Sequence, residues 1–295
     1  MSLNTQCGFI AIVGRPNVGK STLLNKILQQ KISITARKPQ TTRHTIVGIK
    51  TTNHIQMVFI DTPGLHRKAT RALNRYMNRT ASAILKDVAV IVWVVDALKW
   101  THDDELVLEK LQHVSAPVIL VVNKIDLLAH KNDLLPTMQK LSEKRNFAEI
   151  IPISAKNNSQ IDKLEEIISK YLPESEFYYD EDQITNRNER FLASEFIREK
   201  LFRLLGQELP YAISVMIDKY QLKAKILHID AIIWVERAGQ KSIVIGKDGD
   251  LLKKVGTAAR RDIEEMSGHK VFLRLWVKVK ENWADDESYI EMLGK

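Results

Sequence analysis

One eight-residue pattern near the start of the chain restricts the possible folds most. Residues 14–21 read GRPNVGKS, which has the spacing G-x-x-x-x-G-K-[ST] of a phosphate-binding loop. In such a loop, backbone N–H groups approach phosphate oxygens, the lysine contacts the outer phosphates and the last hydroxyl binds Mg²⁺. The loop needs a strand before it and a helix after it. The apolar run Phe9 to Val13 and the helically spaced apolar residues of 23–28 predict both, and so a nucleotide-binding domain.

Three later motifs each follow an apolar run that reads as a strand. They are DTPG at residues 61–64, NKID at 123–126 and SAK at 154–156. Strands that alternate with helical segments indicate an α/β, doubly wound sheet, in which ligands bind at the carboxyl ends of the strands. Each motif stands at such an end. We therefore predict a nucleotide-binding domain over residues 1–173.

The NKID motif indicates which base is bound. The Asp126 carboxylate can accept hydrogen bonds from N1–H and the amino group of guanine, whereas adenine presents an acceptor at N1. Because an unpaired buried polar group costs about 1 to 3 kcal/mol, this carboxylate favours guanine. We expect Asn123 to bridge the base and neighbouring loops, Lys124 to lie along the base, and the Ala155 N–H to donate to the guanine carbonyl. An ATPase that acts on nucleic acid is the alternative that Asp126 disfavours.

The predicted nucleotide site combines these motifs. Ser21 and Asp61 are expected to hold the metal ion, Asp61 through a water, while the Gly64 N–H senses the third phosphate. The full set is Gly14, Arg15, Pro16, Asn17, Val18, Gly19, Lys20, Ser21, Thr22, Asp61, Thr62, Pro63, Gly64, Asn123, Lys124, Asp126, Ser154, Ala155 and Lys156.

The length and charge of the chain predict a second domain and a polyanionic partner. At 295 residues the chain can form two domains. Its 44 Lys and Arg against 36 Asp and Glu give a net charge of +8, which favours nucleic acid or an anionic membrane surface. Cys7 is the single cysteine, so the chain cannot form an internal disulfide. Without a leader or an apolar run of the roughly 20 residues that span a membrane, we expect a cytoplasmic protein.

A charged stretch over residues 174–190 lacks hydrophobic periodicity and is predicted to link the first domain to a second one over 191–295. The second domain reads α-β-β-α-α-β, with a G-x-x-G turn between its two later helices. Such a turn lets a nucleic-acid backbone approach closely. Asp248 places a negative charge in it and weakens phosphate contact. Trp276 and Trp283 are interpreted as packing residues. The predicted RNA-binding residues are Gly246, Lys247, Asp248, Gly249, Lys241, Lys253, Lys254 and Arg260.

These motifs, with QTTRH at 40–44 and DTPGLH at 61–66, resemble the translation-factor-related GTPases of the TrmE-Era-EngA type, and among them the Era family. The resemblance spans nearly the whole chain. It implies a P-loop GTPase domain followed by an α+β type II KH domain. It also implies a monomer that hydrolyses GTP with Mg²⁺, binds the 3′ end of 16S ribosomal RNA and assists assembly of the small (30S) ribosomal subunit. Thr42 is implied as a magnesium ligand, with Thr41 as the alternative, in switch segments around 33–45 and 61–80.

The expectations for catalysis are mixed. Leu65 occupies the position where many GTPases have a water-orienting glutamine, which predicts slow intrinsic turnover. The resemblance implies that Asn17 helps to hold a potassium ion, so the catalytic set is Asn17, Lys20, Thr42 and Gly64. The alternative function is a ribosome- or membrane-associated GTP-binding module with negligible turnover. The basic charge leaves peripheral association with the inner membrane open.

Overall fold

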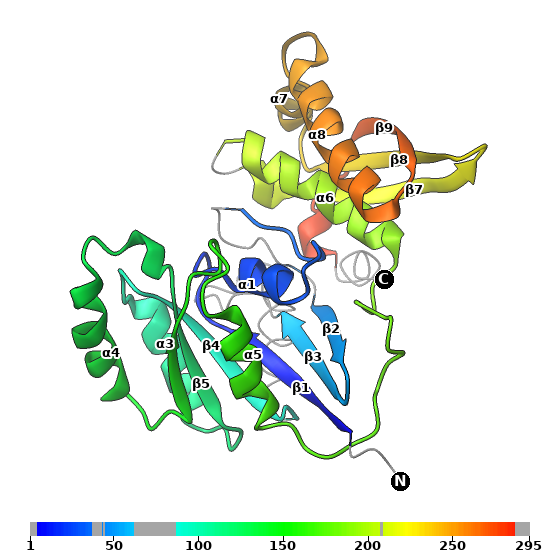
Figure 1. The fold of residues 1–295 in the computed structure, drawn as a ribbon. Coiled ribbons are helices and arrows are strands. Elements are labelled where there is room, and N and C mark those ends of the chain that lie inside the picture. The colour runs from blue at the N-terminus through cyan, green and yellow to red at the C-terminus, as the bar shows by residue number, and fades with distance from the viewer. Residues whose placement is uncertain (1–4, 37–42, 44, 62–86, 207–208, 287–295) are drawn as a thin grey trace. The chain divides into compact units, whose positions relative to one another are not determined.

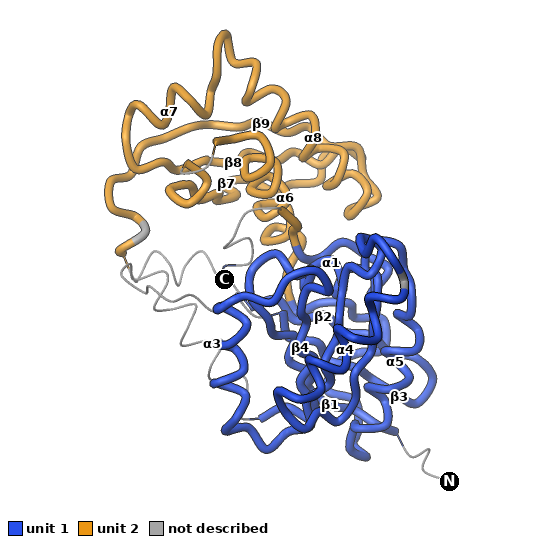
Figure 2. The backbone as a smooth tube through the Cα atoms, turned by 90° about the vertical axis from the view of Figure 1, so that its left-hand side faces the viewer, with its two compact units in different colours: residues 1–33, 42–68, 76–186 blue, residues 34–41, 69–75, 187–295 orange. Residues whose placement is uncertain are grey.

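The computed structural model describes residues 5–36, 43, 45–61, 87–206 and 209–286. These residues form two compact units (Figure 2). The first holds residues 5–33, 43, 45–61 and 87–186, and the second holds 34–36, 187–206 and 209–286. The domain boundaries that the sequence predicts, at 173 and 190, stay a prediction.

The first unit is built on a six-stranded sheet (Figure 1). Its strand order is β2-β3-β1-β4-β5-β6, and every neighbouring pair is parallel except β2–β3. The strands are β1 (Gln6–Val13), β2 (Ile46–Thr52), β3 (Ile55–Asp61), β4 (Val90–Asp96), β5 (Val118–Asn123) and β6 (Glu149–Pro152). The helices are α1 (Lys20–Ile27), α3 (His102–Leu111), α4 (Leu134–Ser142) and α5 (Ile161–Ser169).

The central strands are buried on both faces. On one face, Trp93 of β4 belongs to a cluster with Leu111 of α3 and Leu141 of α4. Residues of the opposite parity, such as Ile10 and Ile12 of β1, are also fully buried. Parallel strands covered on both faces explain the unbroken apolar runs in the sequence. The fold therefore confirms the predicted α/β sheet, with the antiparallel β2 as an added edge strand.

The register of the sheet collects the motifs at one edge. Asp61 closes β3 beside Ile12 of β1, immediately before the GRPNVGKS loop. Asn123 closes β5 beside Asp96 of β4. The carboxyl ends of β1, β3, β4 and β5 therefore lie together, as expected for a ligand site in such a sheet.

Residues 174–186, in the predicted linker, run along strands of the first unit. The Thr185 hydroxyl donates to the Val47 carbonyl of β2 at 2.7 Å. The Gln56 Oε1 of β3 accepts from the backbone N–H groups of Tyr178 and Tyr179 at 2.9 and 3.0 Å. This part of the chain is thus fixed by hydrogen bonds although it forms no helix or strand of its own.

The second unit has the element order α-β-β-α-α-β that the sequence predicts. Its elements are α6 (Glu189–Leu204), β7 (Ile213–Lys223), β8 (Ile226–Val235), α7 (Ala238–Ile245), α8 (Asp250–Ser267) and β9 (Lys270–Val279). β7 pairs antiparallel with β8, and β8 pairs parallel with the edge strand β9. Helix α6 begins where the Asn188 side chain accepts a hydrogen bond from the Phe191 N–H at 2.8 Å, as a helix N-cap does.

The two tryptophans near the end of the chain differ in burial. Trp283 is fully buried, and its indole N–H donates to the Ala212 carbonyl at 3.1 Å. Trp276 is 54% exposed. The interpretation of both as packing residues is therefore right for Trp283 and wrong for Trp276, because Trp276 has the opposite parity to the buried residues of β9, Val271 and Val277.

The length and polarity of the helices bear on whether one of them can cross a bilayer. A transmembrane helix needs about 20 mostly apolar residues. Among the residues that the structure describes, none of the helices combines that length with that apolar character.

Candidate nucleotide site and RNA interface

The GRPNVGKS loop follows β1, ends at α1 and depends on its two glycines. Gly14 has φ +146°, and a Cβ there would lie 2.3 Å from the Val94 carbonyl oxygen. Gly19 has φ +108°, and a Cβ there would lie 2.2 Å from Nδ2 of Asn123. Both positions exclude a side chain on steric grounds and on backbone conformation. The close approach at Gly19 also shows that this loop and the NKID motif meet.

Lys20 is a buried cation at the base of the loop. Its ammonium group donates to the Gly14 carbonyl at 2.8 Å and to the Arg15 carbonyl at 3.0 Å. Burial lowers the pKa of Lys20 to about 8, and the negative charge of Asp61 opposes this decrease. A phosphate group beside this ammonium group would raise its pKa, because a nearby negative charge favours the protonated form.

Asp61, at the end of β3, joins two hydroxyl groups. Its Oδ2 atom accepts from the hydroxyls of Ser21 at 3.0 Å and Ser33 at 2.8 Å, and the side chain is fully buried. Asn25 of α1 holds the Ser33 backbone, since its amide group accepts from the Ser33 N–H and donates to the Ser33 carbonyl. Sequence reasoning missed Asn25, and it placed Ser33 only at the start of a switch segment. A single polar residue between motifs does not by itself indicate a role in the site.

The residues present fit a magnesium ion. The Ser21 hydroxyl and the Asp61 carboxylate are hard oxygen donors, and they lie together. In the described part of the chain there is no cluster of three or more His, Cys, Asp or Glu side chains that could hold a metal ion. A small protein donor set of this kind suits Mg²⁺, which usually completes its coordination with waters and substrate phosphates.

The NKID and SAK motifs form one hydrogen-bonded unit. The Asn123 side chain donates to the Val18 carbonyl at 2.8 Å and accepts from the Ala155 N–H at 3.0 Å. The Ser154 hydroxyl donates to the Asp126 carboxylate at 2.5 Å. The structure thus confirms that Asn123 bridges neighbouring loops, and it shows that Asn123 itself accepts from the N–H expected to meet guanine.

Two charged residues of the predicted site pair with carboxylates at the edge of the sheet. The Lys124 ammonium group lies 2.6 Å from Oδ2 of Asp96, at the end of β4. Nε of Arg15 donates to Asp104 of α3 at 2.9 Å, and this carboxylate also accepts from the Thr101 N–H at 2.8 Å. Sequence reasoning missed Asp96 and Asp104, because an acidic residue after a strand or in the first turn of a helix is common on any surface.

The other predicted residues of the nucleotide site divide into two groups. Asn17 lies in the loop with φ +66°, Thr22 lies in the first turn of α1, and Lys156 is exposed directly after Ala155. Thr41, Thr42, Thr62, Pro63, Gly64 and Leu65 lie outside the described residues.

The G-x-x-G segment joins α7 to α8 through a tight turn. Gly246 has φ +76°, and a Cβ there would lie 2.7 Å from the Leu251 Cβ. Asp248 also has positive φ, at +51°, and is exposed. Gly249 precedes α8, so the first N–H groups of this helix lie beside the turn. This geometry lets an anionic backbone approach the helix N-terminus.

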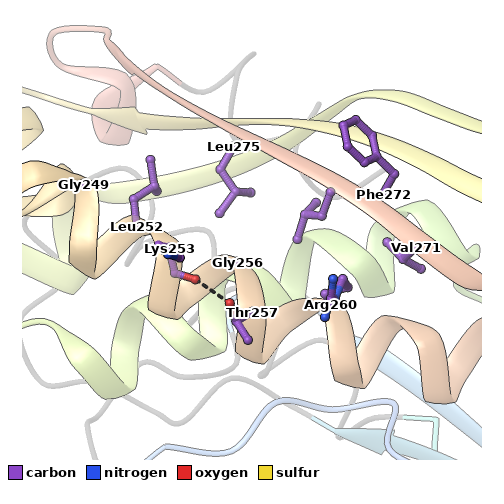
Figure 3. A pocket seen from close by; sticks show the side chains of 10 residues that line it. Gly249, Leu252, Lys253, Gly256, Thr257, Arg260, Val271, Phe272 and Leu275 are labelled. Atoms are coloured by element: carbon purple, nitrogen blue, oxygen red, sulfur yellow. Dashed lines mark hydrogen bonds between the residues drawn. The ribbon is translucent and has the colours of Figure 1, made fainter.

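A groove of about 450 Å³ lies between α8 and β9 (Figure 3). One face of α8 supplies two cations, Lys253 and Arg260, whereas β9 supplies apolar side chains. Lys254 instead pairs with Asp250 at 2.6 Å. Lys241 and Lys247 are exposed and do not line the groove. The lining residues are Gly249, Leu252, Lys253, Gly256, Thr257, Arg260, Val271, Phe272, Leu273 and Leu275.

The fold and the site define a P-loop GTPase domain followed by a KH domain. A family described as "50S ribosome-binding GTPase" matches residues 9–124, and a family described as "KH domain" matches residues 208–284. Two solved structures are similar over 98% of this chain and 99% of theirs, each at 38% identity. One is Era in complex with MgGDPNP and nucleotides 1506–1542 of 16S ribosomal RNA, with a TM-score of 0.94. The other is an Aquifex aeolicus Era variant bound to GDP.AlF4-, with a TM-score of 0.93.

Full-length relatives narrow this class to one family. GTPase Era of Pseudomonas aeruginosa is 55% identical over 290 residues, which are 98% of this chain and 95% of the relative. GTPase Era of Ectopseudomonas mendocina is 57% identical and covers 98% of this chain and 97% of the relative. The chain therefore belongs to the Era family of GTPases, which confirms the resemblance found in the sequence.

Proposed function

We propose that the chain is a GTP-hydrolysing switch that binds the 3′ end of 16S ribosomal RNA and assists assembly of the small (30S) ribosomal subunit. The observation that carries the nucleotide part is the contact of the phosphate-binding loop with the NKID motif, through Asn123 and the Val18 carbonyl. The solved relative that holds MgGDPNP and a 16S ribosomal RNA fragment supports both parts.

Each described motif has a role in nucleotide binding. The backbone N–H groups of residues 17–20 and the Lys20 ammonium group bind the phosphates. Asp126, oriented by Ser154, accepts from guanine, while Asn123 keeps the two loops together. Lys124, held by Asp96, lies beside the base.

Hydrolysis is attack of water on the third phosphate of GTP. Lys20 stabilises the charge that develops on the phosphate oxygens, and its burial strengthens this interaction. Ser21 and Asp61 would hold Mg²⁺, which supplies positive charge at the phosphates. We further propose that Asn17 helps to hold a potassium ion, and that Thr42 and Gly64 complete the site. Equal turnover in potassium and sodium buffers would refute the role of potassium.

RNA binding is assigned to the α8–β9 groove. A KH groove takes about four unpaired bases, with the RNA backbone held at the G-x-x-G turn. The apolar side chains of β9 suit the bases, and Lys253 and Arg260 suit the phosphates. We propose that GTP favours RNA binding, and linkage then requires that RNA favours GTP by the same factor.

Two variants test the GTPase assignment. Lys20→Ala removes the phosphate cation and is expected to abolish multiple turnover. Multiple turnover that is measured in the wild type and disappears in this variant would reject the alternative of a module with negligible turnover. Asp126→Asn is expected to weaken GTP binding and to favour xanthine nucleotide. The asparagine amide can donate to the carbonyl oxygen that xanthine has in place of the amino group of guanine. Unchanged preference for guanine over xanthine in Asp126→Asn would contradict the proposed base contact.

The remaining proposals concern the protein in the cell. We propose a cytoplasmic monomer that associates peripherally with the inner membrane, with domains over 1–173 and 191–295 and a linker over 174–190. The net charge of +8 supports attraction to anionic surfaces. Sedimentation with vesicles rich in anionic lipid tests the membrane part, and absence of the protein from the pellet would refute it. Limited proteolysis tests the boundaries, and cleavage at the end of the predicted linker, after the residues bonded to β2 and β3, is the expected result.

A further inference from the structure

The sheet of the second unit has an outer face that the proposed function does not use. Along β9, side chains alternate between two environments. Val271, Leu273, Leu275 and Val277 are buried or half-buried on the side of α8, and Figure 3 shows Leu275 directed toward that helix and Phe272 turned away from it. The residues of the other parity, Phe272, Arg274, Trp276 and Lys278, are exposed.

Two of these outward residues are large aromatic side chains with unusual exposure. Phe272 is 50% exposed and Trp276 is 54% exposed. Alternate residues of a strand are roughly 7 Å apart, so the backbone positions of the two residues lie about 13 Å apart along β9. Each ring can therefore contact a separate base. Arg274 stands between them on the same face.

The neighbouring strand fixes this arrangement. Arg274 donates from Nε and Nη2 to the two carboxylate oxygens of Asp230, both at 2.6 Å, so the guanidinium plane is held by two bonds. His228 lies opposite Phe272, and their ring centroids are 5.4 Å apart. Arg274 and Phe272 therefore have partners before any ligand binds, which limits the entropy that binding costs at these two side chains.

The chemistry of this face suits RNA better than a protein partner. Cations occupy every second outward position of β9, at Lys270, Arg274 and Lys278, and Asp230 neutralises one of them. Protein–protein interfaces are depleted of lysine, whereas this face presents Lys270 and Lys278. Surfaces that bind single-stranded nucleic acid combine aromatic rings, on which bases stack, with cations that contact the backbone.

The outer face also continues the α8–β9 groove. Phe272 is also among the residues that line this groove, and β9 is an edge strand of the sheet. We propose that the outer face of β9 is a second RNA-binding surface, on which unpaired bases stack on Phe272 and Trp276 while Lys270 and Lys278 contact phosphates. The proposal rests on the RNA-binding function proposed above and extends it to nucleotides beyond those in the groove.

Two RNAs and three variants test this surface. The short RNA carries only the bases that fill the groove, and the long RNA continues past them at both ends. Trp276→Leu keeps an apolar side chain without a ring, and it is expected to weaken binding of the long RNA about 5-fold to 100-fold while leaving the short RNA unchanged. Trp276→Phe retains a ring and is the matched control, with near wild-type affinity for both. Because Trp276 is exposed, these variants are expected to fold, which circular dichroism checks.

The groove variant Lys253→Ala/Arg260→Ala separates this proposal from the function on which it rests. The second surface and the RNA-binding function are both supported if the groove variant binds both RNAs more weakly and Trp276→Leu loses affinity only for the long RNA. If the groove variant loses RNA while Trp276→Leu binds the long RNA as tightly as the wild type, the second surface is refuted and the function stands. If the wild type binds neither RNA, both are refuted. Loss of anionic-vesicle binding, with unchanged RNA affinity in Trp276→Leu, would assign the face to a membrane instead.

Discussion

The buried ammonium group of Lys20 makes nucleotide binding depend on pH. In the described structure burial lowers the pKa of Lys20 to about 8. Phosphate oxygens beside this group favour its charged form, so the pKa rises when GDP or GTP binds. The bound chain therefore carries more protons at Lys20 than the free chain. Binding takes up protons, and affinity decreases as pH rises through the pKa of the free chain.

The size of this effect follows from the titration of one group. With a free pKa of about 8, and with Lys20 kept protonated in the bound state by the phosphates, Lys20 takes up about 0.1 proton at pH 7.0 and about 0.5 proton at pH 8.0. Affinity then decreases about 4-fold between pH 7.0 and 8.5 from this group alone. This range lies well below the pH at which an ordinary lysine loses its proton.

Calorimetry measures the proton uptake directly. GDP binding is titrated with Mg²⁺ at pH 7.0 and 8.0 in buffers with different ionisation enthalpies, and the slope of the observed enthalpy gives the number of protons. A rise of about 0.4 proton between the two pH values is expected. Equal uptake at both values, with affinity independent of pH up to 8.5, would refute the reasoning that Lys20 is a desolvated cation in the free site.

Three further predictions follow from single contacts. Gly19→Ala would place a methyl group against the Asn123 amide at a positive φ, so we expect at least a 10-fold loss of GDP affinity in fluorescence titrations, and wild-type affinity would contradict the close approach of the two loops. Asp104→Asn weakens the hydrogen bond from Arg15 and the bond from the Thr101 N–H that caps α3. Urea unfolding is therefore expected to show a free energy of unfolding that is lower by about 1 to 3 kcal/mol, and an unchanged midpoint would refute the role of this carboxylate. Lys253→Ala is expected to lower the slope of log RNA affinity against log salt concentration by about one. Lys163 is exposed on α5, and Lys163→Ala is the control that is expected to leave this slope unchanged. An equal salt slope in both variants would remove Lys253 from the RNA contact.

Local patterns of the sequence predict most of the fold. The GRPNVGKS spacing requires a strand and a helix around it, and both are present as β1 and α1. The motifs after β3 and β5 come together because parallel strands end at the same edge of the sheet. In the second unit, alternating apolar residues predict β7, β8 and β9 with the right parity.

Pairings between distant residues could not be predicted. Arg15 and Asp104 are 89 positions apart, and their bond depends on how α3 packs on the sheet. The bond from Ser33 to Asp61 likewise depends on the backbone path that Asn25 fixes. These contacts arise from tertiary structure, and the residue types involved are common on protein surfaces.

Trp276 is a different case, because the sequence did contain the relevant signal. The apolar positions of residues 271–279 are odd, so an even position on the same strand faces the other side of the sheet. A tryptophan is large and apolar, and residue type alone predicts that it packs in a core. The even position of Trp276 on β9 predicts instead that it faces away from the buried residues. Parity was the better guide, since the described structure leaves this ring 54% exposed.

The central claim is that one chain couples a guanine nucleotide to RNA. The most direct test measures binding of a short RNA with the sequence of the 3′ end of 16S ribosomal RNA to the protein loaded with a non-hydrolysable GTP analogue or with GDP, and a scrambled RNA serves as the control. The account predicts tighter, sequence-selective binding in the state that holds the GTP analogue. Equal affinity in both nucleotide states, or equal affinity for the scrambled RNA, would contradict it.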